Sequence, residues 1–184
     1  MKAMEEKDLV EACRNGDEGA FEELFKRYSR PLYGVCRRYM GNSADADDVF
    51  QDGFISIISG IGKFSYRGSG SFRAWASKVM MNTALGSLRG RLKGIIPLDG
   101  AEAADVEIEE ETVARIPEET LQEFIVRLPD GYRTVLNMFV FEKMSHREIA
   151  SELNISENTS ATQLLRAKRK LAEMIKEYKA NERD

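Results

Sequence analysis

The sequence has little of what builds cross-linked, metal-bound or membrane-spanning proteins. It contains two cysteines and one histidine among 184 residues, which is too few for a disulfide framework or a zinc site. Cys13 and Cys36 also sit at apolar positions of helical patterns. No apolar run approaches the length that crosses a bilayer, and no signal peptide opens the chain. We therefore expect a cytoplasmic protein with no metal, no cofactor and no membrane insertion.

Strand patterns and internal repeats are missing as well. No stretch alternates apolar and polar residues over a useful length, and no segment recurs at a fixed period. Apolar residues instead recur every three or four positions in several segments, which is typical of amphipathic helices. The sequence predicts an all-α fold, and its length allows one domain or two small ones.

The acidity of the chain is confined to one segment. Residues 1–95 hold 15 basic and 12 acidic residues, residues 96–123 hold one and ten, and residues 124–184 hold 11 and nine. Large apolar residues are also sparse between Pro97 and Pro117, as in a solvated linker. We therefore expect two small helical domains, 1–95 and 121–184, joined by a flexible acidic linker, 96–120. Each domain should fold alone.

The N-terminal block reads as a series of helices. Asp17 is a capping residue for a long second helix, in which Pro31 predicts a kink or break. A third helix, roughly residues 44–61, places Asp45, Asp48 and Asp52 on one face, because they recur at three and four residues.

The helix dipole explains carboxylates in a first turn, and that suffices for Asp45 and Asp48. Asp52 lies beyond this turn. With Phe54 expected to be exposed beside it, the face suggests a docking surface for a basic partner.

A loop rich in glycine and serine follows, with aromatic residues on both sides. Residues 66–94 contain six basic residues and no acid. Aromatic rings among unopposed positive charges suit single-stranded nucleic acid, because the rings stack on bases while Lys and Arg follow phosphates. The alternative is that Phe72 and Trp75 simply belong to a helix core.

Residues 144–168 predict two helices joined by a tight corner. Ser145 and Glu148 match a capping box, residues 154–155 turn the chain, and Ser156 caps the second helix. The exposed face of that second helix is expected to carry Thr159, Thr162, Gln163, Arg166, Arg169 and Lys170. Such a helix-turn-helix can enter a major groove, although similar helix pairs also occur in domains that bind no nucleic acid.

Taken in order, these segments resemble a bacterial RNA polymerase sigma factor of the extracytoplasmic-function (ECF) class. The resemblance extends over nearly the whole chain. It rests on residues 20–25, 45–54, Phe64 with 71–75, 82–84, Leu128-Pro129 and the helix-turn-helix.

The resemblance implies a role for each block. Residues 1–95 would be sigma region 2, which binds core polymerase and opens the −10 promoter element, and residues 121–184 would be region 4, which reads the −35 element. The implied polymerase contacts are Asp45, Asp48, Val49, Gln51, Asp52 and Phe54. The implied −10 contacts are Phe64, Tyr66, Arg67, Phe72, Arg73, Trp75, Lys78, Asn82 and Arg89. The implied −35 contacts are Asn158, Thr159, Thr162, Gln163, Arg166 and Arg169.

The implied partners are core RNA polymerase, promoter DNA and an anti-sigma factor, and the free chain would be a monomer. Ala161, Gln163 and Gly86 depart from residues that are frequent in the family, although Gln can still pair with adenine. Two other readings stay open: a dimeric helix-turn-helix repressor, and a polymerase-binding regulator that does not itself initiate transcription. An enzyme is not expected, because His146 has no plausible nucleophile partner.

Overall fold

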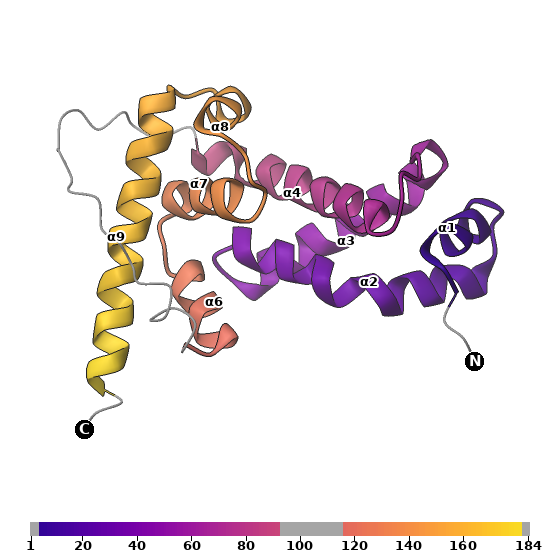
Figure 1. Cartoon of the computed structure of the whole chain (residues 1–184), viewed down its shortest axis with the longest axis horizontal. Helices are drawn as coiled ribbons and strands as arrows, with labels where there is room; N and C mark the ends of the chain where they lie inside the picture. Colours follow the sequence, from indigo (N-terminus) through magenta and orange to yellow (C-terminus); the bar gives the residue numbers. More distant parts are fainter. Residues whose placement is uncertain (1–3, 93–115, 182–184) are drawn as a thin grey trace. The chain divides into compact units, whose positions relative to one another are not determined.

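The computed structural model describes residues 4–92 and 116–181, and every regular element within these two ranges is a helix. The all-α prediction is therefore confirmed. The elements are α1 (Glu6–Arg14), α2 (Glu18–Tyr39), α3 (Ser43–Gly60), the short 3₁₀ helix η1 (Ile61–Lys63), α4 (Ser71–Leu92), α6 (Glu118–Val126), α7 (Asp130–Val140), α8 (His146–Leu153) and α9 (Glu157–Asn181) (Figure 1).

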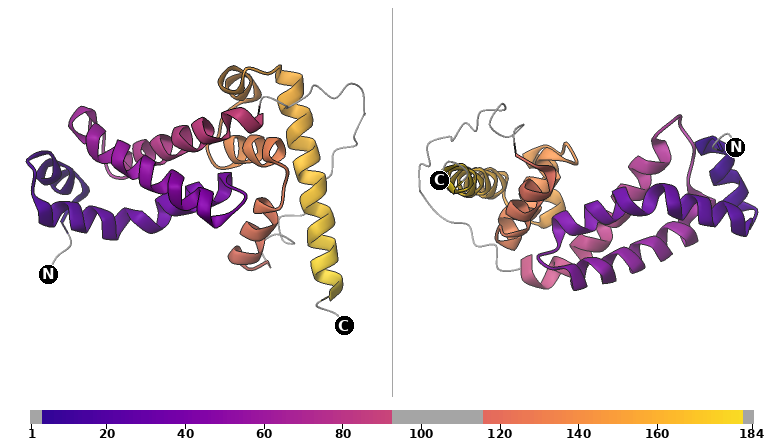
Figure 2. Two further views of the ribbon diagram at one scale, coloured as in Figure 1. Left: turned by 180° about the vertical axis from the view of Figure 1, so that it is seen from behind. Right: turned by 90° about the horizontal axis from the view of Figure 1, so that it is seen from below.

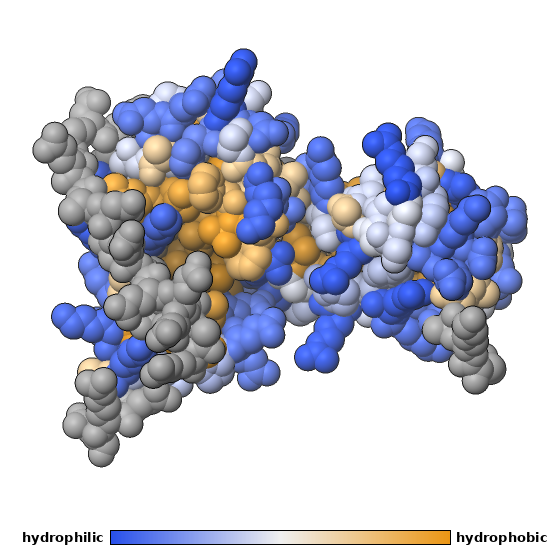
Figure 3. Space-filling model, viewed as in Figure 1, coloured by the Kyte–Doolittle hydropathy of each residue, from blue (hydrophilic) through white to orange (hydrophobic). Residues whose placement is uncertain are grey.

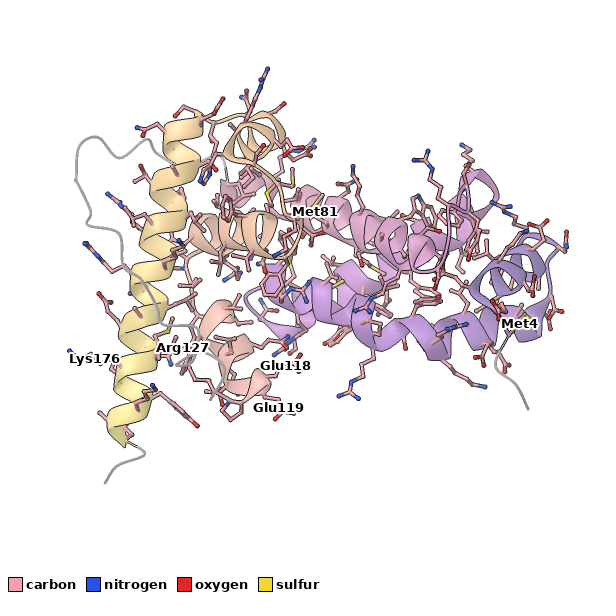
Figure 4. The ribbon with its side chains drawn as sticks, viewed as in Figure 1. Met4, Met81, Glu118, Glu119, Arg127 and Lys176 are labelled. Atoms are coloured by element: carbon pink, nitrogen blue, oxygen red, sulfur yellow. The ribbon has the colours of Figure 1, made fainter. Side chains whose placement is uncertain are left out.

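The chain forms two compact units, Met1–Ser87 and Leu88–Asp184. Most of the predicted linker, 96–120, lies outside the described residues, as does the predicted boundary at residue 95. The last three linker positions, 118–120, belong to the first turn of α6, where Glu118 and Glu119 project from the helix (Figure 4). Among the helices of the described ranges, none combines the length and the apolar character needed to cross a membrane.

Side chains cap the N-termini of two helices in the first unit. The Asp17 carboxylate accepts a hydrogen bond from the Ala20 N–H at 3.0 Å, and the Asn42 side chain accepts one from the Asp45 N–H at 2.8 Å. Both are N-cap bonds of the expected type. Helix α2 continues through Pro31, so of the predicted kink or break, the break is excluded. Packing of the buried Leu32 and Val35 on the far side of Pro31 outweighs the lost backbone bond.

The core of the first unit lies between α2, α3 and α4, which run alongside one another (Figure 2). Gly53 lets α3 and α4 approach closely, because a Cβ built on it would lie 2.4 Å from the Met80 sulfur. The Cys36 thiol lies 3.7 Å from that same sulfur. Burial raises the pKa of Cys36 to about 12. Both cysteines are free and buried.

In the second unit, α9 packs on α6, α7 and α8. The capping box is present: Ser145 Oγ accepts from the Glu148 N–H, and the Ser145 N–H donates to Glu148 Oε2 at 2.8 Å. Asn154 ends α8 in the left-handed region with φ 53°, and Ser156 Oγ accepts from the Thr159 N–H at 2.9 Å. These bonds confirm the predicted helix-turn-helix.

A substitution at Gly86 tests how α4 tolerates glycine. Gly86 is exposed, and a Cβ there would meet nothing within 4 Å. Gly86→Ala should therefore raise the free energy of unfolding by up to about 1 kcal/mol, through helix propensity alone. Gly53→Ala is the matched control and should lower it, because Met80 is fully buried. Denaturation midpoints in urea measure both, and equal shifts for the two variants would contradict this account.

Candidate functional site

The acidic face of α3 divides into exposed and buried positions. Asp48, Gln51 and Asp52 are exposed, whereas Asp45 is half-buried in the first turn. Val49 is only 3 % exposed and packs into the core. The expectation that Val49 contacts a partner is therefore corrected: Val49 faces the core, where its burial supports α3.

An aromatic cluster lies on another side of α3, where Phe25 and Tyr33 of α2 meet Phe50 and Phe54. Phe50 and Phe54 follow Asp48 and Asp52 by two residues each, so the rings and these carboxylates point to different sides of the helix. The Phe25 ring lies 5.1 Å from Phe54 and 6.2 Å from Phe50, and the Tyr33 ring lies 5.7 Å from Phe50. Phe25 remains 47 % exposed. Phe54 is half-buried rather than exposed as expected, because Phe25 of α2 packs against it. Sequence reasoning missed Phe25 and Tyr33, since both reach this surface from another helix.

The carboxylates of α3 differ in whether they form bonds within the protein. The Tyr33 hydroxyl donates to Asp47 Oδ1 at 2.7 Å, and that bond, with burial, raises the pKa of Tyr33. Within the residues that the structure describes, the carboxylates of Asp48 and Asp52 make no ion pair or hydrogen bond. Their charge thus contributes nothing to internal bonding and is accessible to a cationic partner.

Two aromatic residues assigned to single-stranded DNA are core residues. Phe72 is fully buried and Phe64 is 6 % exposed. Their rings lie 5.6 Å apart, and Phe72 also contacts Tyr28 at 4.9 Å. We therefore correct the prediction for Phe64 and Phe72: their rings anchor the two ends of the loop and cannot stack on bases. Trp75 is half-buried against Gly60.

The exposed part of the loop is its middle. Tyr66 is half-buried and Arg67 is exposed. Gly68 has φ +119° and Gly70 has φ +83°, conformations that only glycine adopts without strain. The Ser71 hydroxyl accepts a hydrogen bond from the Arg67 N–H at 3.1 Å. The loop thus turns tightly into α4 while Arg67 is exposed and Tyr66 is partly exposed.

Helix α4 extends this surface with one polar stripe. Trp75, Lys78, Asn82 and Arg89 follow one another at spacings of three, four and seven residues, which places them on one helix face. Lys78, Asn82 and Arg89 are exposed. Arg73 is exposed too, but two residues before Trp75 it lies on the opposite side of α4. Polar residues predominate on the face of the first unit in Figure 3.

The exposed face of α9 is rotated from the predicted one. Thr159 is 5 % exposed and Gln163 is 4 % exposed, so the expectation that both lie on the outer face is wrong. The Thr159 hydroxyl lies 2.8 Å from Ser156 Oγ inside the helix cap. Asn158 and Arg169 are exposed, and Thr162 and Arg166 are half-exposed. Buried Gln163 cannot pair with an adenine edge in this conformation.

Two positions take the place of the buried pair. Ala161 and Leu165 are half-exposed, and their spacing from Asn158, Thr162 and Arg169 puts them on the outer face. Leu165 is apolar, and an apolar side chain on such a face can contact a thymine methyl group. If Gln163 is assigned to the core, the helical period of the exposed residues places Leu165 on the outer face. This period is the sequence signal that could have predicted Leu165.

His146 joins the helices of the corner. Its ring stacks on Phe139 with the centroids 4.8 Å apart, and Nδ1 lies 2.9 Å from Ser160 Oγ. His146 therefore connects α8 to α7 and α9. It supports the orientation of the outer face of α9.

A buried carboxylate joins α1, α2 and the start of α4. Glu6 is 9 % exposed. Its Oε2 accepts a hydrogen bond from the Tyr28 hydroxyl at 2.9 Å, and its Oε1 accepts one from the Phe72 N–H at 3.3 Å. Burial, together with the Glu6 bond, raises the pKa of Tyr28 to about 12.

The pKa of Tyr28 predicts a loss of stability in alkali. Its folded value exceeds the usual unfolded value of about 10. The neutral phenol therefore stabilises the fold fully below about pH 10, and this contribution is lost as the pH rises through about 12. The Tyr28→Phe variant cannot ionise at this position, so it should lose less stability over that window. Urea midpoints against pH measure the difference, and parallel curves would contradict the assignment.

Comparison with known proteins identifies two family segments. The family described as Sigma-70 region 2 matches residues 24–93, and the family described as Sigma-70, region 4 matches residues 118–171. The first contains the acidic face, the loop and all of α4. The second contains the helix-turn-helix.

Similarity to individual proteins extends over nearly the whole chain. The RNA polymerase sigma-H factor of Pseudomonas aeruginosa is 29 % identical over 176 residues, covering 89 % of this chain and 90 % of that protein. The ECF RNA polymerase sigma factor SigW of Bacillus subtilis is 26 % identical, covering 93 % and 97 %. A solved structure of CnrH in complex with the cytosolic domain of CnrY is 25 % identical, with a TM-score of 0.47 and coverage of 91 % and 95 %.

Proposed function

Because the chain belongs to the ECF class of the sigma-70 family and directs promoter-specific transcription initiation, we propose how its surfaces divide that work. Core RNA polymerase and promoter DNA are its partners. The assignment of particular residues to each partner is our proposal. The observation that carries it is the exposure of the Asp48 and Asp52 carboxylates on α3, in contrast to the exposed basic and polar side chains of the loop with α4 and, in the other unit, of α9.

Core polymerase docks on the acidic face of α3 together with the aromatic cluster. Asp48, Gln51 and Asp52 supply exposed polar contacts, and the exposed edge of Phe25 supplies apolar area on the adjoining aromatic side of α3, which Gln51 borders three residues before Phe54. Asp45 lies at the start of the acidic face, where it also favours the helix dipole. Phe54 packs edge-on against Phe25 in the aromatic cluster.

Single-stranded DNA of the −10 element binds along the loop and α4. Tyr66 stacks on an unpaired base, and Arg67 contacts the backbone. The polar stripe of Trp75, Lys78, Asn82 and Arg89 continues the path of the strand. Arg73, on the other side of α4, takes no direct part in it.

Duplex DNA of the −35 element binds the outer face of α9 in the major groove. Asn158, Thr162 and Arg166 approach base edges, Leu165 makes apolar contact, and Arg169 contacts phosphate. Thr159 and Gln163 support the face from inside.

Three finer statements complete the proposal. The free chain is a monomer that acts in the cytoplasm. It is held inactive by an anti-sigma factor, as the class to which it belongs implies. It catalyses no reaction of its own, in keeping with sigma factors generally.

Transcription with purified components tests the proposal. The chain is added to core polymerase on a library of promoter fragments, and the transcripts are sequenced. A sigma factor yields transcripts from a shared pair of −10 and −35 sequences only when the chain is present. A helix-turn-helix repressor would bind duplex DNA without core polymerase, and a polymerase-binding regulator would bind core without selecting any promoter. Either of those results would contradict the proposal.

A further inference from the structure

Helix α1 holds both ends of the loop that is assigned to single-stranded DNA. The Arg14 guanidinium donates from Nε to the Ile61 carbonyl at 3.1 Å and also donates to the Phe64 carbonyl. Eight residues earlier on α1, Glu6 accepts from the Phe72 N–H. One rigid helix of nine residues therefore contacts the loop where it begins and where it ends.

The Glu6 contact replaces a cap that the local sequence does not supply. The first N–H groups of a helix have no partner inside that helix. The residue just before α4 is Gly70, which has no side chain to cap it. The Glu6 carboxylate arrives from another helix and accepts from Phe72, the second residue of α4. A negative charge at this end also suits the helix dipole.

Glu6 is engaged on both oxygens. A buried carboxylate is costly unless it is hydrogen-bonded, and here Phe72 and Tyr28 each donate to one oxygen. Arg14 is similarly occupied, because its third contact is to Glu11 Oε2 at 3.0 Å. Glu6 and Arg14, both on the short helix α1, thus each hydrogen-bond to one end of the same loop.

We propose that α1 positions the loop for strand opening, with Glu6 and Arg14 as positioning residues that touch no DNA. This inference rests on the proposed role of Tyr66. Both residues also precede residue 24, where the match to Sigma-70 region 2 begins. Between the two fixed ends lie the partly exposed Tyr66 and the exposed Arg67. Without those ends the loop samples more conformations, and capturing a base must then order it.

The test compares two loop-end variants with two matched controls in complete polymerase holoenzyme. Glu6→Ala removes the contact to Phe72, and Arg14→Ala removes the contacts to the carbonyls of Ile61 and Phe64. Tyr28→Phe removes only the other partner of Glu6, and Glu11→Ala removes only the other partner of Arg14. Each control disturbs the same charged residue but leaves the loop ends held.

Three quantities are measured for each variant. They are the thermal midpoint of the free chain, duplex promoter binding at low temperature, and the rate at which thymines become reactive to permanganate. We expect Glu6→Ala and Arg14→Ala to slow opening on the order of tenfold, because an unfixed loop must be ordered at each opening event. Duplex binding should be retained, and both controls should open at the unaltered rate.

A conservative change and a double variant separate positioning from general instability. Glu6→Gln keeps a carbonyl oxygen for the Phe72 N–H and should restore the opening rate, including when Glu6→Ala does not fold. Combined with Tyr66→Ala, Arg14→Ala should slow opening no further, because it acts through Tyr66.

Two results would overturn the inference, and they are distinguishable. If Tyr66→Ala slows opening while the loop-end variants match their controls, α1 has no positioning role although the proposed function stands. If Tyr66→Ala itself leaves opening unchanged, the proposed role of the loop fails, and the positioning role fails with it.

Discussion

The double variant Asp48→Arg with Asp52→Arg should abolish binding of the chain to core RNA polymerase while leaving its helical circular-dichroism spectrum nearly unchanged. Both side chains are exposed and lie four residues apart on α3. Truncating one partner of a hydrogen-bonded charge pair that an interface buries costs about 2–5 kcal/mol. Reversing two such charges should therefore weaken binding by roughly 10³-fold or more.

The expectation that folding survives follows from the same positions. Asp48 and Asp52 are not used for internal bonding within the described residues. The cap of α3 depends on Asn42 instead. The spectrum and the thermal midpoint should therefore stay close to those of the unaltered chain.

A matched control distinguishes a local contact from a change in net charge. Glu173→Arg with Glu177→Arg makes the same charge change at the same spacing, on exposed positions of α9. Pull-down of core polymerase at physiological salt, with both double variants side by side, measures the difference. Binding retained by the Asp48/Asp52 variant, or lost equally by the control, would remove α3 as the docking face.

Arg166→Ala and Tyr66→Ala should impair different steps of initiation. Arg166 lies half-exposed on the outer face of α9 with Thr162, so it should meet duplex DNA. Removing a base contact costs roughly 1–3 kcal/mol, whereas removing a phosphate contact lowers the salt slope of binding by about 1. Arg166→Ala should therefore weaken formation of the closed complex on duplex promoters. On a template whose −10 region is already open, it should matter much less.

Tyr66→Ala should show the reverse pattern. Tyr66 lies in the acid-free loop, where it can meet a base only after the strands separate. Loss of one stacked base costs about 1–3 kcal/mol. The variant should bind duplex promoters normally at low temperature and open them slowly.

Gel shifts and permanganate footprints on the same promoter measure both steps. Lys176→Ala is the matched control for Arg166→Ala, because Lys176 is an exposed basic residue farther along α9 (Figure 4). It should leave both steps unaffected. Equal losses for Arg166→Ala and Tyr66→Ala in both assays would show that reading and opening are not divided between these surfaces.

The helices of this fold can be predicted from the sequence because the caps and periodic patterns that define them involve residues close together in the chain. Asp17, Asn42, Ser145 and Ser156 each accept a hydrogen bond from a backbone N–H three residues ahead. A cap and a helical period involve residues within two turns of one another, so all the residues of each pattern lie close together in the sequence. The all-α class and the helix-turn-helix followed from such signals. The ordered set of segments was enough to identify the sigma-factor resemblance.

Which face of each helix is free was decided only by packing between elements. Gln163 is polar, and the sequence placed it outward, but α9 packs on α6, α7 and α8 and turns it inward. Phe64 and Phe72 flank a glycine-rich loop as base-stacking residues would, yet their rings pack on each other and on Tyr28.

The same holds for contacts that join distant parts of the chain. Phe25 reaches Phe50 and Phe54 of α3 from α2, and Glu6 caps α4 from α1. Burial is a property of all the elements around a residue, and a distant cap requires two helices to be placed first. Neither burial nor a cap from a distant helix can be predicted from a period or a short motif. The residues involved are far apart in the chain and meet only in the folded protein.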